Sequence, residues 1–225
     1  MSTANQRVVD HYDSVYLTRD CFNQDNRPYR AFITALVRKA GIPLGSRVLD
    51  AGSGQGYLSR YLSDCGLNVW CSDISEAGLR SLDRYDSVFR GKRIVADMLS
   101  PPFDAGFDLV FQRSCSLFNT AQPGKSAEVV ERLADCVKVG GVLCVVYNTN
   151  LSGRGDVWFN HTLATFRSAF ATSRLSDVQI YALNKVDTVA FGSYSFNPVM
   201  TLVNVVLSKF VHRSFEIVVL ARRCA

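Results

Sequence analysis

Hydrophobic positions along the chain fall into short continuous runs that alternate with stretches in which apolar residues lie three or four positions apart. The first pattern is typical of buried strands and the second of amphipathic helices. On this basis we expect strands at 48–49, 68–73, just before Asp97, and at 107–112, 142–147, 178–183 and 215–221. We expect helices over 30–37, 55–65, 126–139 and 158–170, and from Asn197-Pro198 onward. Gly140-Gly141 would stop the helix over 126–139. This alternation predicts a doubly wound α/β sheet.

One strand-to-helix turn carries three glycines, Gly52, Gly54 and Gly56, directly after Asp50. Glycines let the backbone fold tightly and approach a ligand closely, and the free N–H groups of the following helix face the same place. The next strand ends in Asp73, about twenty residues past the turn, where a βαβ unit places a carboxylate on a ribose. The G-x-G-x-G spacing and the preceding acid disfavour a diphosphate. We therefore expect a cationic nucleoside cofactor and not a dinucleotide.

The segment 48–56, Val-Leu-Asp-Ala-Gly-Ser-Gly-Gln-Gly, resembles the first motif of the class I S-adenosylmethionine-dependent methyltransferases. Further motifs of that family follow in order over residues 46–148. The resemblance implies S-adenosylmethionine as cofactor, S-adenosylhomocysteine as product, and a Rossmann-like fold. That fold has a seven-stranded sheet, mostly parallel with an antiparallel last strand, and an N-terminal helical cap.

The same resemblance assigns residues to the cofactor. It places Asp73 on the ribose, Ile74 against the adenine and Asp97 at the adenine amino group, with a cap that brings Tyr12, Tyr16 and Arg30 to the methionine end. The full expected cofactor-binding set is Tyr12, Tyr16, Arg30, Asp50, Gly52, Ser53, Gly54, Gly56, Asp73, Ile74, Asp97, Met98, Leu99, Gln112 and Arg113.

We expect one domain over 1–225, because the chain contains no linker or repeat. Residues 1–45 would form the helical cap, 46–184 the core, 185–214 an insert and 215–225 the last strand. The insert separates two strands that form a hairpin in the plain family core. Its helix has a wide apolar face, which we expect to pack on the domain and not to act as a lid or a dimer contact.

Composition agrees with a globular protein: 48% of the 225 residues are hydrophobic and the net charge is +5. No apolar run is long enough to span a membrane and no signal peptide is recognisable, so we expect a cytoplasmic protein. Seven cysteines without a C-x-x-C pair indicate reduced thiols, and we expect no metal.

Ser100-Pro101-Pro102-Phe103 is similar to the S-P-P-[YF] signature of amino-methylating DNA methyltransferases. In those enzymes the signature follows the fourth strand, whereas here it precedes it. We interpret it as a loop at the floor of the cofactor pocket. Basic residues are scattered and not clustered, so nucleic acid is unlikely as a partner.

Among the histidines, His161 is the best candidate for a general base, with a solvated helix-face residue as the alternative. Tyr147, Asn148, Arg113 and Ser116 could hydrogen-bond an acceptor. The sequence thus predicts methyl transfer to a small molecule, a hydroxyl of a sugar or secondary metabolite being favoured, by a monomer or homodimer. An NAD(P)-dependent Rossmann oxidoreductase and a non-catalytic S-adenosylmethionine-binding module remain open as alternatives.

Overall fold

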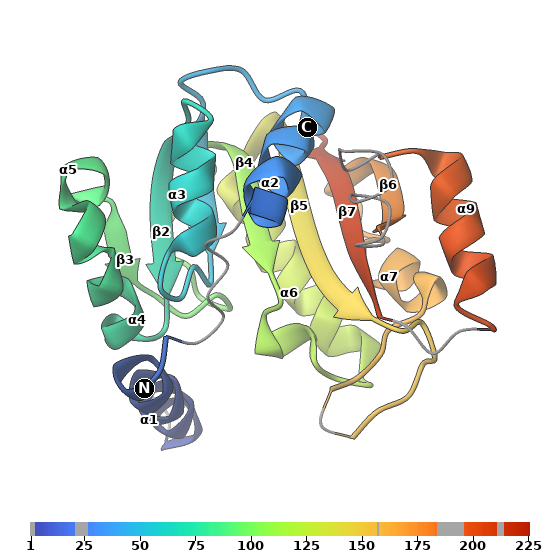
Figure 1. Ribbon diagram of the computed structural model, residues 1–225, viewed down its shortest axis with the longest axis horizontal. Helices are drawn as coiled ribbons and strands as arrows, with labels where there is room; N and C mark the ends of the chain where they lie inside the picture. Colours follow the sequence, from blue (N-terminus) through green and yellow to red (C-terminus); the bar gives the residue numbers. More distant parts are fainter. Residues whose placement is uncertain (1–2, 21–26, 157, 184–195, 211–213) are drawn as a thin grey trace.

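The computed structural model describes residues 3–20, 27–156, 158–183, 196–210 and 214–225 and has a seven-stranded sheet at its centre (Figure 1). The strand order is β3-β2-β1-β4-β5-β7-β6. Strands β1 to β5 pair in parallel, and β7 runs antiparallel to both of its neighbours, β5 and β6. The strands are β1 (Arg47–Ala51), β2 (Asn68–Asp73), β3 (Arg93–Val95), β4 (Phe107–Arg113), β5 (Val137–Thr149), β6 (Leu175–Leu183) and β7 (Phe215–Arg223). The predicted sheet with its antiparallel last strand is confirmed.

Helices cover both faces of the sheet (Figure 1). On one face α2 (Arg27–Ala40) and α3 (Tyr57–Asp64) contribute residues such as Leu36 and Leu62 to a hydrophobic core. On the other face α6 (Pro123–Cys136) and α7 (Leu163–Ala169) contribute residues such as Leu133 and Phe166 to a second core. Central strands are therefore buried on both sides, which explains why their sequences are continuous apolar runs.

Shorter helices lie around this framework. Helix α4 (Glu76–Arg80), a 3₁₀ turn at Ser81–Tyr85 and α5 (Asp86–Phe89) connect β2 to β3, and a 3₁₀ turn at Ser116–Phe118 follows β4. Helix α1 (Thr3–Thr18) lies next to α4, and α9 (Pro198–Leu207) lies beside β6 (Figure 1). None of the helices in the described part of the chain is long and apolar enough to cross a membrane.

The boundaries of three predicted helices are wrong. Helix α3 begins at Tyr57 and not at 55, because Gly54 and Gly56 have positive φ angles of 51° and 75°. Helix α6 starts at Pro123 and ends at Cys136, so Gly140-Gly141 does not stop it. These glycines lie inside β5, next to the point where the β4–β5 register shifts.

The third boundary concerns α7, which begins at Leu163 and not at Trp158. Thr162 is its N-cap residue, and the Thr162 side chain accepts a hydrogen bond from the backbone N–H of Thr165. The preceding segment is held away from a helical path by side chains of β5. The Tyr147 hydroxyl donates to the carbonyl of Phe159.

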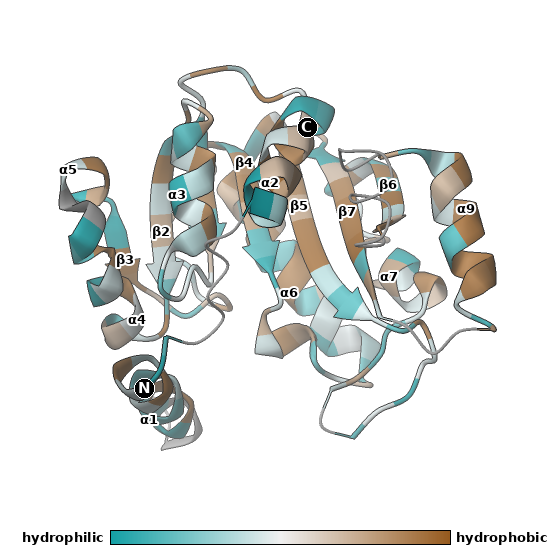
Figure 2. Ribbon diagram, in the orientation of Figure 1, coloured by the Kyte–Doolittle hydropathy of each residue, from teal (hydrophilic) through white to brown (hydrophobic). Residues whose placement is uncertain are grey.

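The insert helix exists, but the prediction that its apolar face packs on the domain is wrong. Asn197 caps α9 as expected. The Thr201 hydroxyl accepts a hydrogen bond from the Ala182 N–H (3.3 Å) and the Asn204 amide donates to the Ala182 carbonyl (2.8 Å), so the polar side of the helix faces β6. The apolar side is exposed (Figure 2), at Val199, Leu202, Val203, Val206, Leu207 and, just beyond the helix, Phe210. Much of the predicted 185–214 insert lies outside the described residues.

Candidate functional site

The glycine turn joins the ends of β1 and β2. The N–H groups of Gly52 and Ser53 donate to the Ser72 carbonyl at 2.8 and 2.9 Å. The Gly54 N–H donates to Asp73 Oδ2 at 2.8 Å. Gly52 and Gly54 both have positive φ, a conformation that side-chain-bearing residues rarely adopt. The turn is thus fixed by backbone bonds and holds one carboxylate in place.

Asp73 is the buried acid at the end of β2. Its Oδ1 accepts a second backbone hydrogen bond, from Ser75 N–H at 2.9 Å, and the residue is 7% exposed. Burial raises the pKa of Asp73, and the N–H groups of Ser75, Gly54 and Ile74 oppose that shift. The carboxylate has a fixed direction and free lone pairs for donors such as vicinal hydroxyls.

Asp50, at the end of β1, is almost fully buried and accepts a hydrogen bond from the Ser59 hydroxyl at 2.5 Å. Burial raises the pKa of Asp50 to about 7; the Ser59 hydrogen bond lowers it and the nearby charge of Asp73 raises it further. A cation next to this carboxyl group would favour its ionised form.

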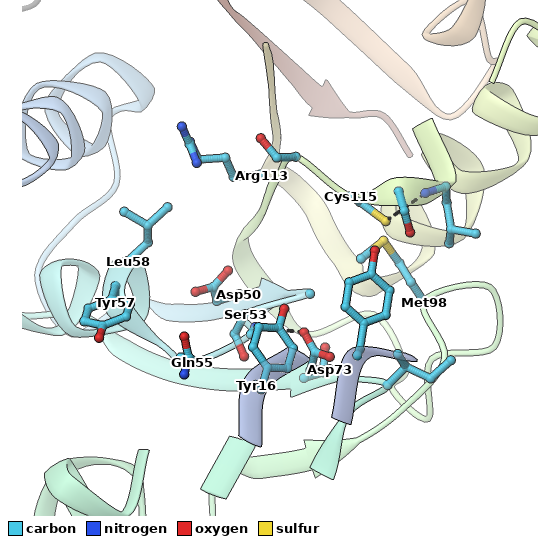
Figure 3. A pocket seen from close by; sticks show the side chains of 18 of the residues that line it. Tyr16, Asp50, Ser53, Gln55, Tyr57, Leu58, Asp73, Met98, Arg113 and Cys115 are labelled. Atoms are coloured by element: carbon cyan, nitrogen blue, oxygen red, sulfur yellow. Dashed lines mark hydrogen bonds between the residues drawn. The ribbon is translucent and has the colours of Figure 1, made fainter. Parts of the chain in front are cut away.

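A cavity of about 610 Å³ runs along the carboxyl ends of the parallel strands. In the view of Figure 3, Asp50 lies between Asp73 and Arg113, and Met98 lies on the Asp73 side. Ile74, Asp97 and Leu99 line the part near Met98. The cavity is lined by Val8, Tyr12, Tyr16, Tyr29, Asp50, Gly52, Ser53, Gly54, Gln55, Tyr57, Leu58, Ser72, Asp73, Ile74, Ala96, Asp97, Met98, Leu99, Arg113, Ser114, Cys115, Ser116, Leu117, Asn148, Trp158 and Ser214.

Arg113 lies at the end of the cavity opposite Met98 (Figure 3). Its Nη2 and Nε both donate to Glu216 Oε1, at 2.5 and 3.2 Å, and Nη2 also donates to the Tyr29 hydroxyl at 2.8 Å. The guanidinium carbon lies 4.8 Å from the centre of the Tyr29 ring. The two charged side chains are 12% and 5% exposed, so this ion pair is buried. Asn148, which pairs with Glu216 across β5 and β7, and Ser214, which directly precedes β7, add polar lining near this end. The Ser116 side chain also lines the cavity, where it hydrogen-bonds Tyr12 of α1.

A methyltransferase-domain family model matches residues 48–141, which include the glycine turn, Asp73, Asp97 and all of β4. Residues 48–141 form a methyltransferase domain. The predicted recognition is confirmed, and the dinucleotide-dependent oxidoreductase is set aside. No curated protein matches this methyltransferase in sequence.

Solved structures share the fold of the methyltransferase. A putative methyltransferase of Haloferax volcanii, in complex with the Trm112 methyltransferase activator, has a TM-score of 0.68 and 19% identity, covering 95% of this chain and 98% of that one. Geranyl diphosphate C-methyltransferase from Streptomyces coelicolor A3(2), with Mg²⁺, geranyl diphosphate and S-adenosylhomocysteine, has a TM-score of 0.64 and 14% identity, covering 99% and 98%.

Haemonchus contortus phosphoethanolamine N-methyltransferase 2, with phosphomonomethylethanolamine and S-adenosylhomocysteine, has a TM-score of 0.61 and 18% identity. The match covers 86% of this chain, but the chain spans about half (52%) of the length of that protein. At these sequence identities the three structures show only that the fold is shared. The substrates named for those proteins are not thereby substrates of this chain.

Most of the predicted cofactor residues line the cavity of the methyltransferase, and three do not. Arg30 lies on the outer side of α2, where it pairs with Asp64 at 3.0 Å. Gly56 serves packing, because a Cβ there would lie 2.0 Å from a methyl carbon of Leu82. Gln112 is fully buried at the end of β4.

His161 also lies outside the cavity lining of the described chain. It is 3% exposed, its Nε2 is 2.6 Å from the Phe118 carbonyl oxygen, and its Nδ1 is 3.1 Å from Thr165 Oγ1. Burial lowers the pKa of His161, and the Phe118 carbonyl opposes this shift. The alternative of a solvated helix-face histidine is wrong, because His161 is buried and precedes α7; its role as general base stays a prediction.

Two other expectations change. Tyr147 is buried and does not line the described cavity. Its ring stacks on that of Trp158, with ring centres 4.7 Å apart, and Trp158 lines the cavity instead. The loop Ser100–Phe103 precedes β4 as predicted, but none of its residues lines the described cavity. Phe103 instead packs edge to face on Phe107.

Sequence reasoning missed several lining residues. Ser114, Cys115 and Leu117 directly follow β4, so extending that strand's end by a few positions would have found them. Tyr29 comes from α2 and Ser214 directly precedes β7, and no local pattern marks either residue.

Proposed function

We propose that the protein transfers a methyl group from S-adenosylmethionine to the hydroxyl group of a small molecule such as a sugar or secondary metabolite. One observation carries the proposal. A single cavity joins the fixed carboxylate of Asp73 beside the glycine turn to the Arg113, Asn148 and Trp158 end of the sheet. A cofactor and an acceptor therefore have space to meet in line.

The residues at the cofactor end fit S-adenosylmethionine. Gly52 and Gly54 place no side chain at two positions of the turn, and the Ser53 hydroxyl between them is buried without a partner among the described residues. Asp73 would hold the ribose hydroxyls and Asp97 the adenine amino group, with Ile74 as an apolar wall. When bound, the cofactor supplies an electrophilic methyl group on a sulfonium.

Three carboxylates, Asp50, Asp73 and Asp97, line the cavity, and they favour a cationic cofactor. The Tyr12 and Tyr16 rings of α1 also face the cavity. The aromatic faces add a further favourable environment for a sulfonium. These features distinguish the site from a diphosphate site, which requires donors at this position.

The acceptor end favours a neutral hydroxyl over a protonated amine. The polar groups there are the Arg113 guanidinium and the side chains of Asn148 and Ser214. The Glu216 carboxylate, which could attract an ammonium group, is engaged by Arg113. With His161 away from the cavity, we propose that catalysis rests on placing the hydroxyl in line with the methyl group.

Calorimetry and radiolabel transfer test this function. We expect S-adenosylhomocysteine to bind and to raise Tm, because it stabilises only the folded state, whereas NAD should do neither. Labelled S-adenosylmethionine would then be offered with panels of hydroxyl, amine and carbon acceptors. Label in hydroxyl compounds supports the proposal. Label only in amines or carbon acceptors would overturn the hydroxyl assignment, and binding with no transfer to any panel would favour a non-catalytic module.

A further inference from the structure

Helix α1 contributes Val8, Tyr12 and Tyr16 to the cavity lining, but none of its described side chains belongs to the hydrophobic cores. From Gln6 to Asp20 no residue is buried, and the partly covered face carries Val9, Tyr12, Asp13 and Tyr16. An isolated helix of this length is only marginally stable in water. The position of α1 therefore depends on a few specific contacts with the rest of the site.

The first contact is made by Asp13. Its Oδ1 accepts hydrogen bonds from the Ser75 hydroxyl at 2.5 Å and from the Ala77 backbone N–H at 3.2 Å. Ser75 is fully buried, and its own N–H donates to Asp73. Asp13 thus connects α1 to the residue that orients the Asp73 carboxylate, yet Asp13 is not among the residues lining the described cavity.

The second contact is a notch that receives the Tyr16 ring. A Cβ on Gly54 would lie 2.8 Å from the Tyr16 hydroxyl oxygen, and a Cβ on Gly78 would lie 2.9 Å from a Tyr16 ring carbon. Gly78 lies within α4 and has no positive φ, so alanine would suit its backbone. Glycine at position 78 thus provides space and not backbone conformation: chiefly space for the Tyr16 ring, and also for the Gly54 carbonyl oxygen, from which a Cβ would lie 3.2 Å.

A third pair of contacts holds the carboxyl end of α1. The Gln55 amide donates to the Arg19 carbonyl at 3.3 Å, and the Tyr57 hydroxyl hydrogen-bonds Asp20. Both partners come from the turn and helix on the α3 side of the cavity, whereas Ser75 and Gly78 lie on the α4 side. Helix α1 therefore bridges the cofactor end of the cavity.

From these contacts we propose that Asp13 and Gly78 are positioning residues: they hold α1 closed over the bound cofactor and so set the rate of cofactor exchange. The inference rests on the proposed function. Tyr12 and Tyr16 reach the cavity from α1, so exchange requires the helix to move. Asp13 and Gly78 act through that helix and touch neither reacting group.

Dissociation of S-adenosylhomocysteine, followed by stopped-flow fluorescence, measures the effect. Asp13→Ala removes both hydrogen bonds and should raise the dissociation rate about tenfold. Asp13→Asn keeps an oxygen acceptor and should stay near wild type, as should the control Asp10→Ala, whose carboxylate contacts only Gln6 of the same helix in the described structure. Tm without ligand should not change, because α1 adds nothing to the cores. KM for S-adenosylmethionine should rise more than kcat falls.

A double-mutant cycle tests the notch. Gly78→Ala should also speed dissociation, and this effect should become much smaller in a Tyr16→Ala background, because the added methyl group then meets only the Gly54 carbonyl oxygen and no ring. An effect of Gly78→Ala that is equally large without Tyr16 would overturn the notch. Wild-type binding with equal dissociation rates in all variants would overturn the inference alone. No binding by the wild type would overturn the proposed function together with it.

Discussion

The two ends of the cavity are held in place by different means. At the cofactor end, Asp73 receives two backbone N–H groups, from Gly54 and Ser75. At the acceptor end, Arg113 is positioned by two side chains, Glu216 and Tyr29, from elements far apart in the sequence. A site fixed by the backbone needs only a local motif. A site fixed by side chains can change by substitution while the sheet stays the same, so the acceptor end is where specificity is free to vary.

The largest expected effect is at the acceptor end. Arg113→Gln would leave the Glu216 carboxylate buried without its partner and should lower the free energy of unfolding by about 3–5 kcal/mol. Urea unfolding measures this loss. The double variant Arg113→Gln, Glu216→Gln should recover most of it. Arg80→Gln, in the exposed pair with Glu76, is the control and should have little effect. If Arg113→Gln and Arg80→Gln lowered the free energy of unfolding by the same small amount, the Arg113–Glu216 pair would not stabilise this end of the cavity.

At the cofactor end, Asp73→Ala should weaken S-adenosylhomocysteine binding by about 1.5–3 kcal/mol, because a charge-assisted hydrogen bond to the ribose is lost. Calorimetry measures the dissociation constant. Asp83→Ala, at an exposed acid that pairs with Arg93, serves as control. Unchanged affinity in Asp73→Ala would show that the backbone-fixed carboxylate does not contact the cofactor.

The same contrast explains what the sequence could predict. Gly52, Gly54 and Asp73 follow one another within a single βαβ unit, so their spacing alone indicated the turn and the acid. Arg113 was found because it directly follows a strand, but its partners could not be found: Tyr29 and Glu216 are 84 and 103 residues away in sequence. His161 was misplaced because tertiary contacts of Tyr147 and Thr149 hold its segment outside any helix. For α9, periodicity identified the helix but not which side faces the sheet.

A pH series sharpens the picture of Asp50. Its pKa of about 7 means that the carboxyl group is largely protonated below that pH and ionised above it. S-adenosylmethionine is a sulfonium cation, so its binding should tighten as pH rises through about 7, by up to about tenfold between pH 6 and 8. S-adenosylhomocysteine lacks the sulfonium and should depend less on pH. Asp50→Asn should remove the difference between the two ligands; a difference that survives this substitution would assign it to another group.

The smallest effect on catalysis is expected for His161. His161→Gln keeps a nitrogen donor for the Phe118 carbonyl and removes the imidazole. We expect kcat with a true acceptor to stay close to wild type and both limbs of the pH profile to remain, because the ring faces away from the cavity. A loss of about 100-fold with unchanged Tm would instead identify His161 as the general base.

The orientation of α9 bears on how the molecule avoids self-association. Strand β6 ends the sheet, and an outermost strand with free N–H and C=O groups is a template for pairing with another chain. Thr201 and Asn204 occupy both backbone groups of Ala182 and block strand addition there. The exposed apolar residues lie on α9, where the backbone N–H and C=O groups are already hydrogen-bonded within the helix. The insert therefore protects against edge-to-edge aggregation while it leaves a hydrophobic surface that cannot seed a growing sheet.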